Sequence, residues 1–455
     1  MHQETISEAK YRKMMETPIP KLVGSLAIPT TISTMITVIY NTADTYFVSQ
    51  INESASAAVG VAYSIMAILQ AVGYGLAMGS GSLISRYLGK KMDKEACGFA
   101  ASGFYASMLV GLVAGGIFLA VLEPLLRLIG ASDTMMPYAV PYARIILMGA
   151  PMSCASFVVV HLLRAEGNTK LAMWSSLSGG LLNLVLDPLL IFGCNMGTAG
   201  AALATVASQL VNFIIPVIAF SGRKTILSLH PRHISRSWKT YGQIVSTGSP
   251  TILRQGLGSL SATVLNISAV VYGDATVAAI TISGKIYTLV RQLIMGIGQG
   301  FQPVAGYNYG AGNKKRAYGA FKFAVLLGTG ICTVAAVLIA IFAEPIMWWF
   351  CDSGDVARIG TEVLLISCAV MPLLGFSTFV NQLYQCLGFS KIASFLASCR
   401  QGLFFIPCVL ILPRFLDALG VEATQSLADL MTFLVSIPFA IRFYRREVKP
   451  YRENA

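Results

Sequence analysis

Two carboxylic acids lie inside stretches of the sequence that are otherwise apolar. Asp44 falls within YNTADTYFVSQ (40–50), and Asp187 falls within NLVLDPLLIFG (183–193), where a proline follows it directly. A charged side chain in hydrocarbon costs several kcal/mol, so an acid inside a membrane span is expected to serve a function. On a helix, Tyr40 lies one turn from Asp44 on the same face, and Asn183 stands in the same relation to Asp187.

These acids and one threonine predict a binding site for Na⁺ or H⁺. With a helical rise of about 1.5 Å per residue, Asp44 and Asp187 lie about 12 Å, and Thr205 about 10 Å, below the outer ends of their helices. Two carboxylates, an amide oxygen and a hydroxyl at one height supply hard oxygen ligands and proton acceptors. We therefore predict that Na⁺ or H⁺ binds at Asp44, Asn183, Asp187 and Thr205, with Tyr40 beside them.

Two structural interpretations of the acids remain open. Asp187 could form an ion pair with Arg144, and Asp44 could be a carboxylate at the membrane interface. Pro188 favours movement of the helix beside Asp187, because it removes one backbone hydrogen-bond donor and leaves the carbonyl of Leu184 without its usual partner. A kink is therefore expected in the helix beside Asp187.

The composition requires a membrane around these acids. Of 455 residues, 55% are hydrophobic and 12% charged, with a mean hydropathy of +0.67, whereas about a quarter of the residues in soluble domains are charged. Windows of about 19 residues predict twelve spans. Their ranges are 23–49, 57–83, 97–122, 138–161, 171–193, 198–220, 243–271, 276–303, 318–343, 359–381, 392–413 and 424–443.

The net charge of +12 reflects topology and not a nucleic-acid partner. Outside the predicted spans, lysines and arginines gather in the termini and the even-numbered loops, while the odd-numbered loops hold only Arg127, Arg358 and Arg414. This asymmetry places both termini in the cytoplasm by the positive-inside bias. We expect a multi-pass protein of the plasma membrane, monomeric because nothing in the sequence marks an oligomer interface.

The chain contains an internal duplication. A shift of 221 residues without a gap superposes glycines, prolines, a Glu-Pro pair and a loop lysine of the two halves. The pairs include Pro29 with Pro250, Gly75 with Gly296, Gly79 with Gly300, Glu123-Pro124 with Glu344-Pro345, and Lys170 with Lys391. Each half has six spans, so the halves share one orientation about an axis along the membrane normal. We predict an all-α protein with an N-terminal bundle (1–220), a cytoplasmic linker (221–240) and a C-terminal bundle (241–455).

Five motifs resemble the multidrug and toxin extrusion (MATE) family, in particular its bacterial branch of MepA-type and DinF-type exporters. They are YNTADTYFVSQ (40–50), LRAEGNTKLAM (163–173), NLVLDPLLIFGCNMGTAGAALATVASQ (183–209), SPTILRQ (249–255) and GIGQGFQPVAGYNYGAGN (296–313). The resemblance implies a V-shaped pair of six-helix bundles that exports organic compounds in exchange for Na⁺ or H⁺. The family's cation-site positions correspond here to Asp44, Asn183, Asp187 and Thr205, with Tyr40 beside them.

The second half departs from the family pattern. Some branches carry acids in helices 7 and 10, where this chain has Arg254, Asn381 and Gln382. The charged residues that we place within the spans of this half are all basic, which predicts no coupling site there and a preference for acidic or zwitterionic substrates. Alternatively, these bases snorkel or bond to backbone carbonyls. The predicted substrate cavity comprises Arg254, Lys285, Arg291, Asn381, Gln382 and Arg400.

Other functions have less support in the sequence. A lipid-linked oligosaccharide flippase of the same broad superfamily shares this plan, but the paired acids and the segment 307–310 favour an exporter. A membrane enzyme would need a convergent set such as HExxH, and none is present; His161 is isolated and expected at the membrane interface. The glycine-rich stretch 73–82 predicts close helix packing. We predict an antiporter that works by alternating access, with no cofactor apart from its coupling ion.

Overall fold

The computed structural model describes residues 6–222, 225–351 and 353–450, which are helical almost throughout and contain no β-strand. Ten of the described helices are long and apolar enough to cross a membrane, and the bent pair α6 (Met136–Met148) and α7 (Ala150–Ala165) adds an eleventh. The remaining predicted span is α10 (Trp238–Val270), which is 33 residues long but more polar. The all-α prediction is confirmed.

The first bundle follows a short helix, α1 (Ile6–Glu16). Besides α6 and α7, it consists of α2 (Ile19–Ser49), α3 (Glu53–Gly89), α4 (Asp93–Ala120), α5 (Leu122–Ile129), α8 (Thr169–Pro188) and α9 (Gly197–Ser221). Local signals set these ends: the Asn52 side chain accepts a hydrogen bond from the Ala55 amide at 2.7 Å and begins α3. Gly130, at φ 109°, ends α5 in the left-handed region that glycine tolerates.

The second bundle repeats this order after the linker. It consists of α10, α11 (Asp274–Gly310), α12 (Lys314–Ile341), α13 (Ala343–Phe350), α14 (Gly354–Leu387), α15 (Ser390–Ser398), α16 (Phe405–Ile411) and α17 (Pro413–Phe443). Within the linker, residues 231–233 form one 3₁₀ turn, and α10 already begins at Trp238, three residues before the predicted boundary.

Three spans are interrupted where the sequence weakens the helix. α6 and α7 meet at 54°, at Gly149 and close to Pro151. α8 passes after Pro188 into a π-helical turn, Leu189–Gly193, and a second π-helical turn, Cys399–Leu403, separates α15 from α16. The proline beside Asp187 therefore changes the hydrogen-bonding pattern of the helix without ending the span.

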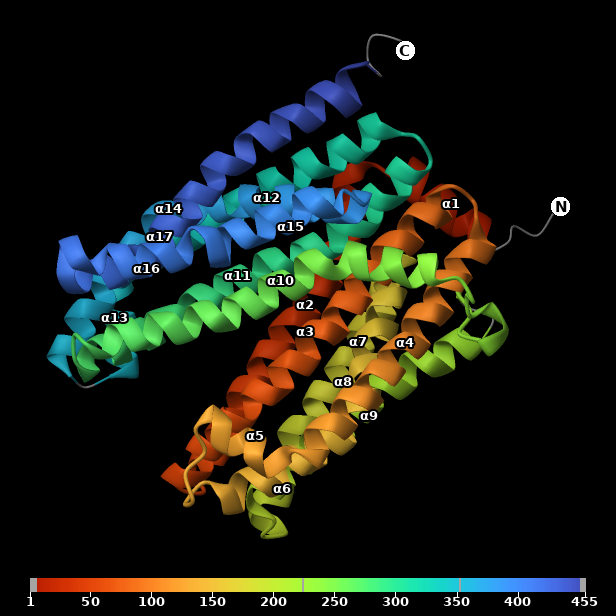
Figure 1. Ribbon diagram of the computed structural model, residues 1–455. Helices are drawn as coiled ribbons and strands as arrows, with labels where there is room; N and C mark the ends of the chain where they lie inside the picture. The colour runs from red at the N-terminus through yellow and green to blue at the C-terminus, as the bar shows by residue number, and fades with distance from the viewer. Residues whose placement is uncertain (1–5, 223–224, 352, 451–455) are drawn as a thin grey trace.

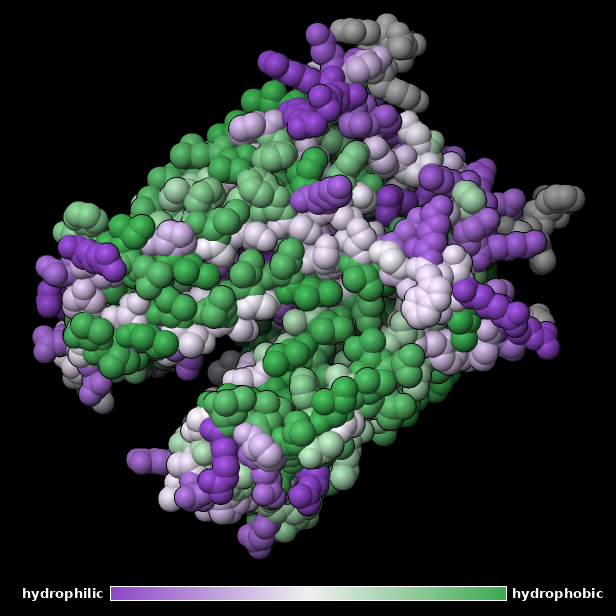
Figure 2. Space-filling view, viewed as in Figure 1, coloured by the Kyte–Doolittle hydropathy of each residue, from purple (hydrophilic) through white to green (hydrophobic). Residues whose placement is uncertain are grey.

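The two bundles form a V that is closed at one end (Figure 1). Both chain termini lie at this closed end, and the bundles diverge away from it. Hydrophobic side chains cover the flanks of both arms, whereas hydrophilic ones gather at the closed end and at the two tips (Figure 2). An apolar band between two polar ends is the distribution that a bilayer requires.

Glycines from each half join the bundles. Each packs so closely against a helix of the other bundle that a Cβ atom would collide with it. Gly75 and Gly79 of α3 lie against Ile252 and Gly248 of α10, and Gly296 and Gly300 of α11 lie against Thr31 and Ala27 of α2. The 221-residue shift converts one set of pairs into the other, so the duplication produces a pseudo-two-fold axis between the bundles, and the predicted close packing at 73–82 is confirmed.

Candidate ion and substrate sites

The packing of α2 on α8 brings the two predicted acids to one level. Gly180 of α8 lies against Ile36 and Tyr40 of α2. The two helices run in the same direction, so seven residues further along α8 Asp187 reaches the height of Asp44. Their carboxyl groups interact electrostatically across this interface. The structure thus brings Tyr40, Asp44 and Asp187 together, as the sequence predicts.

Asp187 and Asn183 form the buried centre of this site. Their exposed fractions are 0% and 1%, and Asn183 Nδ2 donates to Asp187 Oδ1 at 3.2 Å. Three buried acceptors, Asp187 Oδ2, Asn183 Oδ1 and Asp44 Oδ1, have no hydrogen-bond donor among the described residues. Because an unsatisfied buried oxygen is costly, this arrangement favours a proton or a hard cation.

Thr205 lies on the neighbouring helix α9. Gly179 packs against the Ser208 backbone, and Gly200 packs against the Leu190 backbone. Between these two contacts, Thr205 shares the level of the Asn183–Asp187 pair. One turn further along α9, Gln209 Oε1 is another buried acceptor that lacks a donor in the described part of the chain, and Gln209 lines a small cavity with Gln70 of α3 and Ser153 of α7.

Sequence reasoning missed a buried tyrosine at this site and the buried Gln209 on the neighbouring helix. Tyr142 of α6 is 1% exposed and interacts electrostatically with both Asp44 and Asp187. The four-residue spacing from Thr205 could have indicated Gln209. No local pattern indicates Tyr142, because its position depends on how α6 packs in the bundle.

The interpretation of Asp187 as an ion-pair partner of Arg144 receives no support. Arg144 is exposed on α6, and no ion pair to Asp187 occurs within the described ranges. Asp44 is half-buried, with its Oδ1 atom enclosed. The described residues also contain no cluster of three His, Cys, Asp or Glu side chains that could hold a metal ion.

The prediction that the second half buries only bases is wrong. Asp429 of α17 is 3% exposed and accepts a hydrogen bond from Arg400 Nε at 2.6 Å. Tyr287 joins this ion pair, since its hydroxyl accepts from Arg400 Nη2 at 2.6 Å and donates to Asp429. Glu422 is a second buried acid of α17. Asp429 lies inside the predicted span 424–443, so residue type and position alone could have found it.

The other residues of the predicted substrate cavity do not all lie together. Arg254 is hydrogen-bonded to Asn381 Oδ1 at 3.5 Å, and it interacts electrostatically with Arg291 and Arg400. Gln382 is buried, with its Nε2 atom 3.3 Å from the sulfur of Met295. The structure therefore brings Arg254, Arg291, Arg400 and Asn381 together, whereas Lys285 is exposed on α11.

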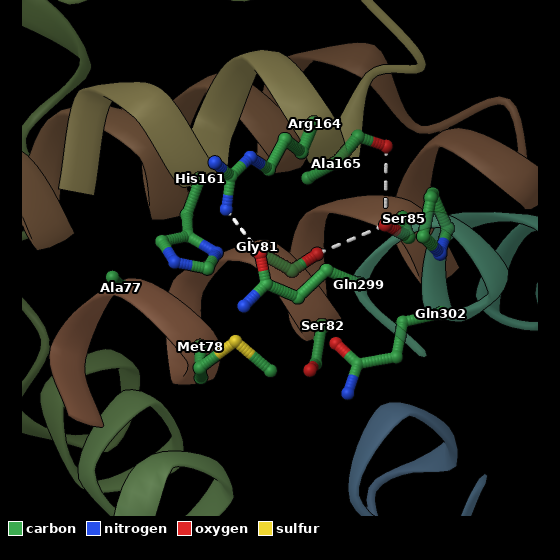
Figure 3. Close-up of a pocket in the computed structure, with 11 residues that line it drawn as sticks. Ala77, Met78, Gly81, Ser82, Ser85, His161, Arg164, Ala165, Gln299 and Gln302 are labelled. Atoms are coloured by element: carbon green, nitrogen blue, oxygen red, sulfur yellow. Dashed lines mark hydrogen bonds between the residues drawn. The ribbon is translucent and has the colours of Figure 1, made fainter. Parts of the chain in front are cut away.

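A further polar group lies where the bundles meet. His161 of α7, expected at the membrane interface, is buried, with its ring 5.9 Å from that of Tyr74. Arg164, which the sequence placed in a cytoplasmic loop, is also buried and donates a hydrogen bond to Gln299 of the second bundle (Figure 3).

Comparison with known proteins matches both halves of the chain. A sequence model of the MatE family matches residues 29–189 and 250–411, segments that begin 221 residues apart. The multidrug export protein MepA of Staphylococcus haemolyticus (strain JCSC1435) is 26% identical over 420 residues, which cover 92% of this chain and 90% of the relative.

Solved transporter structures superpose on almost the whole chain. The outward-facing conformation of a multidrug resistance MATE family transporter of the MOP superfamily aligns with a TM-score of 0.91 and 25% identity, over 96% of this chain and 98% of that one. A MOP superfamily transporter from Pyrococcus furiosus Vc1 (DSM3638), described as having a binding pocket of reverse polarity, aligns with a TM-score of 0.89 and 25% identity, over 95% and 97%.

Proposed function

The chain belongs to the MatE family and is a multidrug efflux transporter rather than an enzyme, and from this premise we propose that Na⁺ or H⁺ entry drives its export. The coupling ion binds at Asp44, Asn183, Asp187 and Thr205, beside Tyr40. One observation carries the proposal: three buried acceptor oxygens on two adjacent helices lack a donor within the described ranges. Two neighbouring acids can share a proton or hold a cation, so the site can exchange a bound proton for a bound cation.

The place of this site on α2 supports a mechanism of alternating access. The same helix contacts the second bundle, where Thr30 Oγ1 donates to the Gly296 carbonyl at 2.7 Å. Occupation of the acids by an ion therefore acts on a helix that also holds the two bundles together. A ligand shifts such an equilibrium by its difference in affinity for the two states. We propose that ion binding changes the cleft and expels the substrate.

The orientation in the membrane is part of the proposal. The charge asymmetry of the loops puts both termini in the cytoplasm of a bacterial cell, and the bundles meet at the end where the termini lie. The open cleft then faces outward across the inner membrane. We propose a monomer as the working unit, with small organic compounds as its cargo.

The test is dye efflux from vesicles driven in turn by an imposed Na⁺ gradient and an imposed pH gradient. Asp187→Asn should abolish gradient-driven efflux at equal protein abundance, because it removes a charge that must bind and release the ion. Asp133→Asn is the matched control, since its side chain is 84% exposed in a surface pair with Arg127. Efflux that ignores both gradients, or survives Asp187→Asn, would contradict ion coupling and favour a flippase.

We further propose that the second bundle favours substrates with an acidic or zwitterionic part. Asp429 neutralises Arg400, but no carboxylate pairs with Arg254 or Arg291 in the described chain. Arg291→Gln should weaken binding of an anionic dye about ten-fold relative to a cationic analogue, measured by fluorescence anisotropy. Tight binding of the cation alone, unchanged in Arg291→Gln, would disprove the preference.

A further inference from the structure

A small cavity of about 20 Å³ lies where α3 and α7 of the first bundle meet α11 of the second. Figure 3 shows Arg164 and His161 on one side of the cavity, the Gln299 amide against the Arg164 guanidinium, and Ser82 and Gln302 beyond Gln299. The volume suffices for one small group such as a water molecule, a halide ion or the tip of a carboxylate.

Two buried hydrogen-bond donors in the lining of this cavity have no acceptor among the described residues. Arg164 is 7% exposed, and its charge has no carboxylate partner in the described part of the chain. One guanidinium nitrogen donates to Gln299, while Nε has no acceptor. Gln302 is 8% exposed, and its Nε2 donor is also unpaired among the described residues. A buried, unpaired cation is strongly unfavourable unless an anion or further acceptors compensate it.

We propose that this cavity binds a small anionic group, either the carboxylate or sulfonate of an exported compound or a free chloride ion. Arg164 supplies the charge, and Gln302 Nε2 and Ser82 Oγ supply neutral donors. This inference rests on the proposed export function only where the anion belongs to the cargo. A phosphate ester is disfavoured, because the cavity offers one cation and little volume.

The position of the cavity makes anion binding sensitive to conformation. Arg164 belongs to the first bundle and both glutamines to the second, so these side chains line one cavity only while the bundles meet at the closed end. A bound anion would stabilise this state, and separation of the bundles would release it. Occupation of this cavity by an anionic group would thus change the equilibrium between joined and separated bundles.

The experiment is thermal unfolding of the full-length purified protein in neutral detergent, titrated with potassium chloride and with potassium acetate, so that Na⁺ binding does not contribute. Arg164→Gln and Arg144→Gln have the same net charge, so general salt effects are matched between them. We expect both anions to raise the midpoint of the wild type and of the Arg144→Gln control by several degrees. Arg164→Gln should lose this response, and Arg164→Lys should retain part of it.

A second variant and a dye distinguish the remaining outcomes. Gln302→Leu removes a donor without altering charge, and it should weaken the anion response about three-fold even if Arg164→Gln folds poorly. Binding of fluorescein that weakens at least ten-fold in Arg164→Gln, while rhodamine 6G binds unchanged, assigns the site to cargo. A chloride response with unaltered fluorescein binding assigns it to the free ion.

Equal responses to both anions in wild type, Arg164→Gln and Gln302→Leu would overturn the proposal. Failure of the exporter mechanism would look different, because Asp187→Asn leaves the cavity intact and should keep the full anion response. The binding measurement and the efflux measurement can therefore fail independently.

Discussion

The ion pair between Arg400 and Asp429 is the most enclosed charge interaction in the described part of the second bundle, with side-chain exposures of 12% and 3%. We expect Asp429→Asn to destabilise the protein by about 3–5 kcal/mol, because removing one partner leaves a buried charge without compensation. Thermal unfolding of the purified variant measures the loss. Glu362→Gln is the control, since its pair with Arg358 at 3.5 Å is exposed and should contribute less than about 1 kcal/mol.

The double variant Arg400→Gln with Asp429→Asn distinguishes the stability contributed by the ion pair from the cost of burying a lone charge. It should lose less stability than the sum of the two single variants, because no lone charge remains. Strict additivity would mean that the two side chains do not interact.

At this scale the sequence predicted the grouping of Tyr40, Asp44, Asn183 and Asp187 better than the charge pairs elsewhere in the protein. Asp44 and Asp187 stand out because acids are rare in apolar helices, and helical spacing connects them to Tyr40 and Asn183. Arg164 was misplaced because it lies at the end of α7, and sequence does not reveal that α11 covers that end. Charge pairing across a fold, as between Arg400 and Asp429, has no local signature.

At the scale of elements, Glu166 joins three segments at the closed end of the molecule. It is 0% exposed, pairs with Lys10 of α1 at 2.9 Å and accepts the Ile226 amide of the linker at 3.0 Å. Burial raises the pKa of Glu166, and Lys10 opposes that shift. The lysine of α1 thus helps to keep the carboxylate ionised for its contact with the linker.

We expect Glu166→Ala to release α1 and the linker from the loop that follows α7. Trypsin should then cleave at Arg232 or Arg236 several-fold faster than in the wild type, because local opening governs cleavage. Gel analysis of a digestion time course measures this rate, and Glu95→Ala, an exposed acid of α4, is the control. Equal rates in both variants would show that Glu166 does not restrain the linker.

The helices were predicted correctly where the sequence has long hydrophobic segments and less well where it does not. The sequence located the twelve passes but gave no sign of α1, which ends at the closed end against the second bundle: the Asn308 side chain donates to the Met14 carbonyl at 3.3 Å. The sequence also did not predict the bend between α6 and α7, because Gly149 and Pro151 permit a bend without fixing its angle.

For the whole molecule, the four glycines of the duplication hold the bundles together. We expect Gly79→Leu and Gly300→Leu to lower the thermal midpoint by similar amounts, because each side chain would strike the backbone of the opposing helix. Overpacking of this kind costs about 1–3 kcal/mol or more. Gly116→Leu and Gly330→Leu are the controls, since a Cβ at either position meets no atom within 4 Å.

Unequal effects of Gly79→Leu and Gly300→Leu would mean that one contact dominates the closed end. Effects no larger than those of the controls would mean that neither contact holds the bundles. Loss of soluble protein is itself measurable as reduced yield after size-exclusion chromatography, and it should again be similar for the two variants.

The symmetric glycine contacts have a consequence for the construction of the chain. Each half carries both the surface that approaches, on α3 or α11, and the surface that receives it, on α2 or α10. When a position of the first half contacts a position of the second half, the two equivalent positions in the opposite halves also contact each other. This reciprocity is the geometry of an isologous homodimer. The join between the bundles is therefore a subunit interface held within one polypeptide, and the linker makes its two sides free to diverge in sequence.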